Sequence, residues 1–164
     1  MVDDDPCLLE VYDFGRESSL HLFEALCQLV DRVHVYVFVF SIIDRHSFHQ
    51  VEVLYGKLCN HLGVNWLPGV LAGTKSDLVT SLPTETCVTQ DEATAMATRL
   101  GLACYVETSA KVGVNPKLPF IEAVRLGRSY QQHLHEYSRS LRPPRLSTSS
   151  CEDGGRVGRR CVLH

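Results

Sequence analysis

The stretch from Pro68 to Asp77 reads Pro-Gly-Val-Leu-Ala-Gly-Thr-Lys-Ser-Asp and decides the fold class of this chain. Its apolar part, residues 68–72, is predicted to be a buried strand that ends at Gly73. Polar residues that directly follow such a strand are typical of the loops at the carboxyl edge of a parallel sheet, where ligands bind. We therefore expect a ligand site in the loops that follow strands.

Further strands and helices are predicted to alternate along the chain. Strands are expected at residues 7–12, 33–41 and 102–106, and the strand at 33–41 is apolar on both faces, as in the interior of a parallel sheet. Helices are expected after Ser18 or Ser19, from Asp44 to about Leu62, from Thr89 to Gly101, and from Leu118 to Tyr137. This alternation predicts right-handed βαβ units and an α/β fold with a parallel sheet.

The apolar positions of the predicted helices repeat with the period of an α-helix. In the second helix the predicted buried side consists of Phe48, Val51, Leu54, Tyr55 and Leu58.

Length and composition indicate one folded domain with a tail. The chain has 164 residues, of which 45% are hydrophobic and 21% charged, which excludes a wholly disordered protein. The composition shifts to Arg, Ser, Pro and Gly after Tyr137, so we expect a domain at residues 1–137 and a flexible basic tail at 138–164. The acidic start of the chain is unlike a signal peptide.

Charge and cysteine content restrict the class of partner. The net charge is −3, but the tail carries six arginines against two acids, so the body is acidic and the tail basic. An acidic body disfavours nucleic acid as a partner, and a basic tail favours an anionic surface. The seven cysteines lack metal-ligand or disulfide-framework spacing, which predicts no metal site and a reduced, cytosolic compartment.

Three of the four predicted strands end in chemically specific residues. These are the segments 73–77, 107–111 and 13–17, with the sequences Gly-Thr-Lys-Ser-Asp, Glu-Thr-Ser-Ala-Lys and Asp-Phe-Gly-Arg-Glu. Together and in this order they resemble the Ras superfamily of small GTPases over most of residues 8–137. The resemblance implies a three-layer α/β sandwich with a mostly parallel sheet, the P-loop NTPase-like G domain.

The first two segments resemble the guanine-binding loops of that family. Guanine presents a ring N–H beside an exocyclic amine, and the resemblance implies that the Asp77 carboxylate accepts both. Lys75 would lay its methylene stem along the base plane, and the hydroxyl of Thr74, where the family usually has asparagine, would tie loops together. In the second loop, Ser109, Ala110 and Lys111, the Ala110 amide would meet the guanine carbonyl.

Each of these loops taken alone is more often a simple polar turn. Their joint placement at the ends of consecutive strands favours the guanine-binding interpretation.

The third segment departs from the family pattern. The family has Asp-x-x-Gly followed by a glutamine that positions the attacking water, whereas here one residue fewer separates Asp13 from Gly15, and Arg16 replaces the glutamine. By resemblance, Asp13 would support magnesium through water and the Gly15 amide would approach a γ-phosphate. Arginine has no acceptor for the attacking water, so we predict weak or absent hydrolysis and assign no catalytic residue.

The phosphate-binding loop of the family is absent from the sequence. No Gly-x-x-x-x-Gly-Lys-Ser/Thr motif occurs in the 164 residues, and the resemblance implies that the magnesium threonine of switch I would precede Cys7. We expect a G domain that lacks its first strands, in which the strands at 7–12 and 33–41 pair directly to give a four-stranded sheet. A shortened isoform, a truncated gene model and a degenerate family member remain alternatives.

The chain ends in Cys161-Val162-Leu163-His164, which matches a prenylation box. We expect lipidation of Cys161, with nearby arginines as a second membrane signal, and Cys151 is a weaker candidate for palmitoylation. This predicts a cytoplasmic protein held on the inner, cytosolic leaflet of the plasma membrane or an endomembrane. His164 is unusual at the last position and leaves the choice of lipid open.

The function favoured by these features is a Ras-like small GTPase, a signalling switch that binds GTP or GDP with magnesium and meets effector or regulator proteins. The alternative is a nucleotide-free pseudo-GTPase or truncated isoform that acts as an interaction module. A flavodoxin-like binder is disfavoured because the sequence offers no Ser/Thr-rich phosphate loop. The subfamily stays open, because the short loop from Leu78 to Thr89 lacks a long Rho-type insert whereas Thr74 and the Cys-Val-Leu ending favour Rho-like members.

Overall fold

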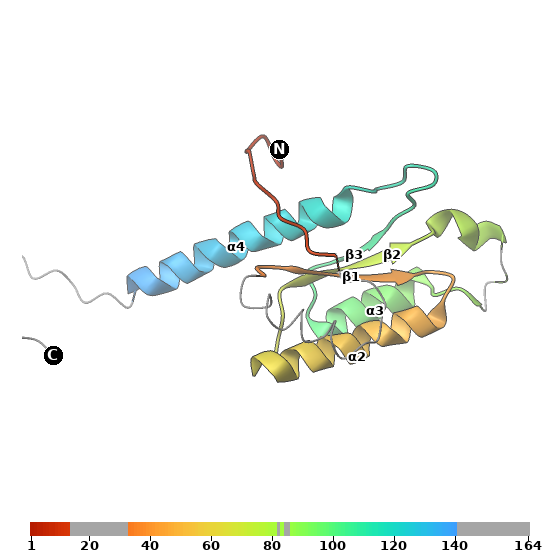
Figure 1. Ribbon diagram of the computed structural model, residues 1–164, viewed down its shortest axis with the longest axis horizontal. Helices are drawn as coiled ribbons and strands as arrows, with labels where there is room; N and C mark the ends of the chain where they lie inside the picture. Colours follow the sequence, from red (N-terminus) through yellow and green to blue (C-terminus); the bar gives the residue numbers. More distant parts are fainter. Residues whose placement is uncertain (14–32, 82, 84–85, 141–164) are drawn as a thin grey trace, which may run out of the picture.

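The computed structural model describes residues 1–13, 33–81, 83 and 86–140, which form three layers (Figure 1). The middle layer is a parallel sheet of β1 (Tyr36–Ser41), β2 (Gly69–Thr74) and β3 (Tyr105–Glu107), in that order. Helices α2 (Arg45–Leu62) and α3 (Gln90–Leu100) cover one face, and α4 (Leu118–Ser140) lies on the other. A 3-10 helix, η2 (Ser76–Ser81), follows β2. The predicted three-layer α/β fold is confirmed.

The centre of the sheet is β2, whose first five residues are all buried. On the face covered by α2 and α3, Phe40 and Leu71 belong to a large apolar core with Phe48 of α2. On the opposite face Val70 and Val106 pack with Ala123 of α4 in a smaller cluster. The face of the sheet under α4 is therefore covered less completely than the face under α2 and α3.

The two helices beneath the sheet begin where the sequence predicts. The Asp44 side chain accepts a hydrogen bond from the Ser47 amide at 3.2 Å, which satisfies an amide at the start of α2. The Thr89 hydroxyl accepts from the Glu92 amide, and the Glu92 carboxylate accepts from the Thr89 amide, which forms a capping box at the start of α3. Both caps confirm the predicted starts.

Both helices also end at a left-handed glycine, which permits a test of local packing. Gly63 has φ +65° with open space at its Cβ position, whereas Gly101 has φ +69° and an added Cβ would lie 2.8 Å from Trp66 Cδ1. We predict that Gly63→Ala costs about 1–2 kcal/mol of unfolding free energy, from backbone strain alone. Gly101→Ala should cost about 1–3 kcal/mol more through crowding. Urea unfolding of the two variants measures the difference, and equal losses would contradict the contact with Trp66.

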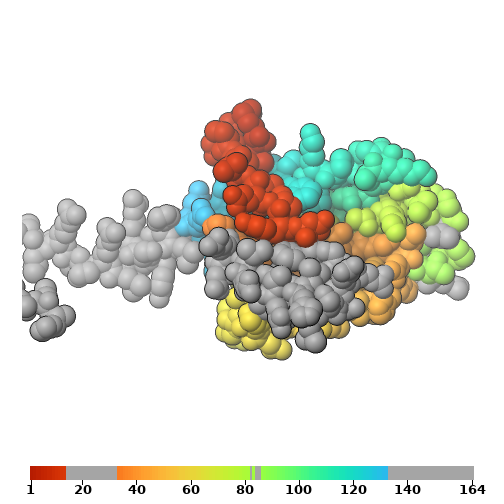
Figure 2. All heavy atoms as spheres, in the orientation of Figure 1, coloured from red at the N-terminus to blue at the C-terminus, as the bar shows by residue number. Residues whose placement is uncertain are grey.

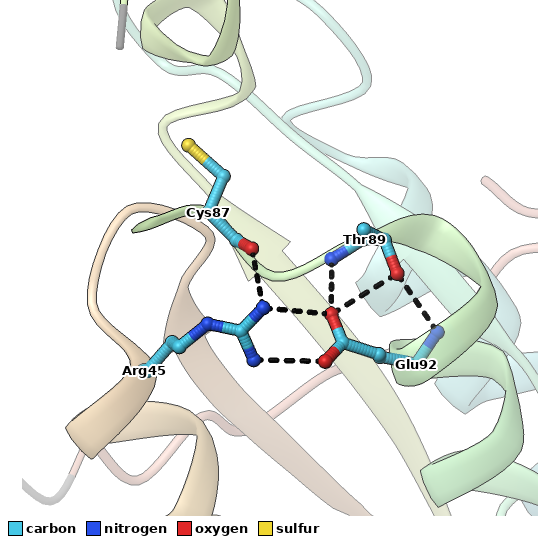
Figure 3. Close-up of polar contacts among 4 residues, drawn as sticks. All are labelled: Arg45, Cys87, Thr89 and Glu92. Carbon is cyan, nitrogen blue, oxygen red and sulfur yellow. Dashed lines mark hydrogen bonds and ion pairs between the residues drawn. The ribbon is translucent and has the colours of Figure 1, made fainter. Parts of the chain in front are cut away.

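An ion pair joins the two helices beneath the sheet (Figure 3). The Arg45 guanidinium donates to both Glu92 carboxylate oxygens, at 2.8 and 3.2 Å, and to the Cys87 carbonyl at 2.9 Å. The same Glu92 carboxylate caps α3 through Thr89. Arg45 thus fixes the start of α2 against the start of α3.

This pair predicts a pH dependence of stability. The Arg45 hydrogen bond, with the Thr89 amide, lowers the pKa of Glu92 to about 2 from an ordinary value of 4.5. The stabilisation is therefore present above pH 4.5 and is lost as the pH falls towards 2. Solvent screens the pair, since both side chains are more than a third exposed, so the loss should not exceed about 1 kcal/mol.

Glu92→Gln should remove that part of the acid destabilisation. The measurement is the free energy of urea unfolding at pH 5 and pH 3 for the natural chain, for Glu92→Gln and for Asp91→Asn, which removes a charge from the same helical turn. If the unfolding free energy of the natural chain and that of Glu92→Gln depend on pH in the same way, the acid destabilisation does not come from Glu92.

The strand predicted at residues 7–12 is wrong. Residues 6–13 form no strand, and the side chain of Leu8 is 94% exposed. A strand needs a partner for its backbone groups, and the described sheet contains only β1, β2 and β3. The expected direct pairing and the four-stranded sheet are therefore wrong too, and β1 lies at the end of the strand order instead of in the interior.

Smaller corrections concern side chains and element ends. Leu54 was predicted on the buried side of α2 but is 39% exposed, since the buried stripe passes through Val51, Tyr55 and Leu58. The strand predicted to stop at Gly73 continues to Thr74. The strand expected at 33–41 begins later, at Tyr36, but ends at Ser41 as predicted, whereas the strand expected at 102–106 is shorter and shifted, at Tyr105–Glu107. Helix α4 extends to Ser140, three residues beyond its predicted end.

The first residues of the chain lie against α4 rather than in the sheet (Figure 2). Residues Val2 and Asp5 exchange backbone hydrogen bonds at 3.1 Å around a tight turn. The Asp3 carboxylate accepts from Arg125 at 2.8 Å, and the Val2 carbonyl accepts from Arg128 at 3.0 Å. The Arg125 hydrogen bond lowers the pKa of Asp3, so this acidic turn is held by two arginines of α4.

The helix expected after Ser18 or Ser19 and the tail beyond residue 140 lie outside the described residues. Of the helices that the structure describes, none has the length and hydrophobicity needed to span a membrane.

Candidate functional site

The first loop of the candidate site leaves the carboxyl end of β2. Thr74 closes the strand, and its hydroxyl donates to the Phe40 carbonyl of β1 at 2.9 Å, so it ties two strands together rather than two loops. Lys75 has φ +65°, a left-handed conformation that is uncommon for a residue with a side chain. The chain turns there and enters η2, whose first turn carries Asp77.

The second loop leaves the neighbouring strand β3. The Thr108 amide and hydroxyl both donate to the Gly73 carbonyl, at 2.7 and 3.2 Å, and the Thr108 carbonyl accepts from the Ser76 amide at 3.1 Å. Gly73 is required at this crossing, because an added Cβ would lie 2.5 Å from the Tyr105 hydroxyl oxygen. The two loops are therefore fastened at their bases.

A side-chain contact then joins the tips of the two loops. The Ser109 hydroxyl donates to the Asp77 carboxylate over 2.5 Å, and Ser109 is 1% exposed. The Ser109 backbone also exchanges hydrogen bonds with Val114 at 2.9 Å in both directions, which closes the loop that contains Ala110 and Lys111. A carboxylate has about four acceptor positions, so the contact with Ser109 fixes Asp77 while leaving capacity to accept from a ligand.

The two loops line one cavity of about 590 Å³. All six residues predicted for guanine binding are among its lining residues, namely Thr74, Lys75, Asp77, Ser109, Ala110 and Lys111. The structure thus brings together, at one end of the sheet, residues from two loops that are 32 positions apart at their Asp77–Ser109 contact.

The electrostatics of this end of the sheet are mixed. The exposed Lys75 and Lys111 and the half-buried Asp77 all line the cavity. Burial raises the pKa of the Tyr105 hydroxyl, which therefore stays protonated and donates to the Glu107 carboxylate at 3.3 Å. A ligand here meets one carboxylate, two lysines and several backbone groups.

The residues predicted for the phosphate and magnesium side are not part of this cavity. Asp13 is exposed at the end of the first described segment and does not line the cavity. Gly15, Arg16, Cys151 and Cys161 lie outside the described residues. Among the residues that the structure describes, no cluster of three His, Cys, Asp or Glu side chains is arranged to hold a metal ion.

The described residues fit the base of a guanine nucleotide better than its phosphates. Asp77 supplies a fixed acceptor beside the exposed Ala110 backbone and the Lys75 stem. Neither the described residues nor the sequence motifs supply a loop of amides for phosphates, and Asp13, the predicted magnesium residue, lies apart from the cavity. Among the described residues, the groups that line the cavity are therefore those predicted for the base, and Asp13, predicted for the magnesium side, is not among them.

Some lining residues were not anticipated from the sequence. Besides the two loops, the cavity is lined by apolar residues that belong to no sequence motif: Val37, Val39, Ala72, Pro116, Pro119 and Phe120. The prolines beside Phe120 at the start of the last helix were the only local signal in the sequence. The amide of Asn115, which donates to the Glu107 carbonyl at 3.2 Å, was also missed.

The structure is an α/β domain with a cavity at the carboxyl ends of its parallel strands, which is where ligands bind in such folds. Comparison with known families makes this more specific, since the Ras family model matches residues 1–128. The chain therefore belongs to the Ras family.

Individual relatives have names that agree with this membership. The chain is 31% identical over 122 residues to the GTP-binding protein RHB1 of Saccharomyces cerevisiae, a match over 70% of this chain and 57% of that protein. It is 32% identical to the GTP-binding protein Di-Ras2 of Pongo abelii over 76% of this chain and 59% of the relative. It is 31% identical to the Ras-related protein R-Ras of Homo sapiens, a match that covers 99% of this chain and 67% of that protein. The chain thus spans about half the length of several relatives that it matches.

Proposed function

We propose that this chain is a guanine-nucleotide-binding module of the small GTPase type, which acts in signalling through effector or regulator proteins. The observation that carries the proposal is the 2.5 Å contact between Ser109 and Asp77. It joins the two loops that the sequence predicts for guanine and orients the Asp77 carboxylate at a cavity that both loops line. Family membership supports the same ligand class.

Base recognition follows from the chemistry of these groups. A carboxylate accepts the adjacent ring N–H and amine of guanine, whereas adenine presents no such pair of donors. Charge-assisted hydrogen bonds of this kind contribute about 1.5–3 kcal/mol each. The Lys75 stem would cover the base plane and the Ala110 amide would donate to the guanine carbonyl.

Hydrolysis is proposed to be weak or absent. Arg16 stands where the family has the glutamine that orients water, and an arginine side chain only donates hydrogen bonds. The sequence also lacks the phosphate-loop motif. The module would therefore bind nucleotide chiefly through the base.

The direct experiment is equilibrium binding of fluorescent GDP, GTP and ATP to the purified full chain, with and without magnesium. The proposal predicts that GDP and GTP bind and that ATP does not, with little effect of magnesium because the described site fits the base alone. Equal binding of ATP, or absence of guanine-nucleotide binding up to millimolar concentration, would contradict it.

The alternative function is an interaction module that binds no nucleotide. The exposed position of Asp13, outside the cavity, favours this alternative. In that case the helices would present a Ras-like surface to partners without a nucleotide-dependent switch. Absence of guanine-nucleotide binding by a chain with a cooperative unfolding transition would favour the interaction module.

We also propose that Cys161 is prenylated and holds the chain on the cytosolic face of a membrane. In this reaction, catalysed by a separate enzyme, the Cys161 sulfur displaces diphosphate from an isoprenyl diphosphate. A carbon–sulfur bond forms, the carbon–oxygen bond to diphosphate breaks, and the thiol proton passes to solvent. Intact-mass measurement after expression in eukaryotic cells tests this, with Cys161→Ser expected to abolish the modification and Cys151→Ser expected to retain it.

A further inference from the structure

The face of the sheet that carries α4 is only partly covered. Alternate residues of β1 point to this face, and Val37 packs in the small cluster with α4 while Val39, two residues further, is 57% exposed. Phe120, in the first turn of α4, is 39% exposed. An apolar surface therefore remains open between the carboxyl half of β1 and the start of α4.

This open surface is hollowed rather than flat. Val39 and Phe120 line the same cavity of about 590 Å³ as the two loops, together with Ala72, with Pro116 of the loop before α4 and with Pro119 of its first turn. The volume is in the range of small-molecule pockets. The lining residues that β1 and the start of α4 contribute carry only aliphatic and aromatic side chains, which suits a flexible hydrocarbon ligand.

The chain itself provides a candidate for such a ligand. Twenty residues, 141–160, separate the end of α4 at Ser140 from Cys161. The cavity lies at the other end of α4, and a helix of 23 residues is about 34 Å long. Twenty residues can span up to about 66 Å, so a group on Cys161 can reach back along α4 to Phe120.

We infer that the isoprenyl group on Cys161 docks, in the same chain, in the apolar end of the cavity between Val39 and Phe120. This inference rests on the proposed prenylation. Docking removes the hydrocarbon from water and covers the open face of the sheet in one contact. The lipidated chain then exists in a docked form and in a form whose lipid is available to a membrane.

Competition between the two forms has a measurable consequence. A single lipid chain gives only marginal membrane binding, so an intramolecular site of moderate strength suffices to hold the lipid away from the bilayer. When nine-tenths of the molecules are docked, the apparent membrane affinity falls by about tenfold. Any change that spoils the cavity should restore that affinity.

The experiment uses the full chain, prenylated and unprenylated, with vesicles of phosphatidylcholine and phosphatidylserine. The test variant is Val39→Asp, which places a charge in the cavity, and the matched control is Val53→Asp, an exposed valine of α2 that is 47% exposed. Phe120→Ser is a second test variant on the opposite wall. Circular dichroism confirms that each variant is folded, and intact mass confirms the lipid.

The inference predicts that Val39→Asp and Phe120→Ser raise vesicle binding of the prenylated chain by about tenfold, whereas Val53→Asp leaves it unchanged. The unprenylated chains should all bind alike. Prenylated Val39→Asp and Phe120→Ser that bind like the natural chain would overturn docking while leaving the lipidation intact. A mass without the isoprenyl group would overturn both.

Discussion

Asp77→Ala is expected to weaken GDP binding by a factor of about 10² to 10⁴. The variant removes both hydrogen bonds that the carboxylate would accept from guanine, and two charge-assisted bonds together contribute about 3–6 kcal/mol. It also removes the partner of the Ser109 hydroxyl, which is fully buried. Fluorescence titration of the full chain with labelled GDP measures the effect.

Two further variants make this prediction specific. Asp91→Ala removes an exposed carboxylate of α3 away from the cavity and should leave GDP binding unchanged. Ser109→Ala keeps the Asp77 carboxylate but removes the hydrogen bond that orients it. This variant should therefore lose less GDP affinity than Asp77→Ala. Equal GDP affinity in the natural chain and Asp77→Ala would exclude Asp77 from base recognition.

Phe40→Ala should have the largest effect on stability, a loss of about 3–5 kcal/mol of unfolding free energy. Phe40 is 2% exposed, and its ring centroid lies 4.9 Å from that of Phe48 in α2 and 6.0 Å from that of Tyr105 in β3. The substitution leaves a cavity where the sheet meets α2. Because the total unfolding free energy of a small domain is about 5–15 kcal/mol, a large shift of the urea midpoint is expected.

Phe120→Ala is the matched control for this effect. Phe120 is 39% exposed at the start of α4, so the same change of side chain should cost much less unfolding free energy. Similar losses for the two variants would contradict the position of Phe40 in the core.

The elements that could be predicted from the sequence are those fixed by local chemistry. Asp44 and Thr89 cap helices through hydrogen bonds to residues three positions along the chain, and such contacts depend on sequence spacing alone. The apolar run at Val70 and Leu71 is buried on both faces because α4 covers one face of β2 and α2 and α3 cover the other, which is what a continuous hydrophobic run predicts.

The elements that were mispredicted depend on distant partners. Residues 7–12 have the composition of a strand, yet Leu8 is exposed because composition does not supply a neighbouring strand. Val39 has the same side chain as the buried Val70 but is exposed, since helix coverage of a sheet face is set by how the whole chain folds. Tertiary arrangement overrides β propensity in both cases.

For the candidate site, strand order determined what could be predicted. Because β2 and β3 are adjacent and parallel, their following loops meet, and the sequence motifs around Asp77 and Ser109 sufficed to predict a joint site. Asp13 was predicted from a motif that the sheet does not position beside them. The apolar end of the cavity has no sequence motif, because it arises from incomplete coverage by α4.

The most direct test of guanine recognition by the two loops is the response of individual backbone amides to GDP, measured by heteronuclear NMR of the full chain with ADP as a control. If residues 74–77 and 109–111 form one guanine-recognition site, GDP shifts the amide signals of both segments together, with one dissociation constant, and ADP shifts neither. Shifts confined to one segment, or the same shifts with ADP, would contradict it.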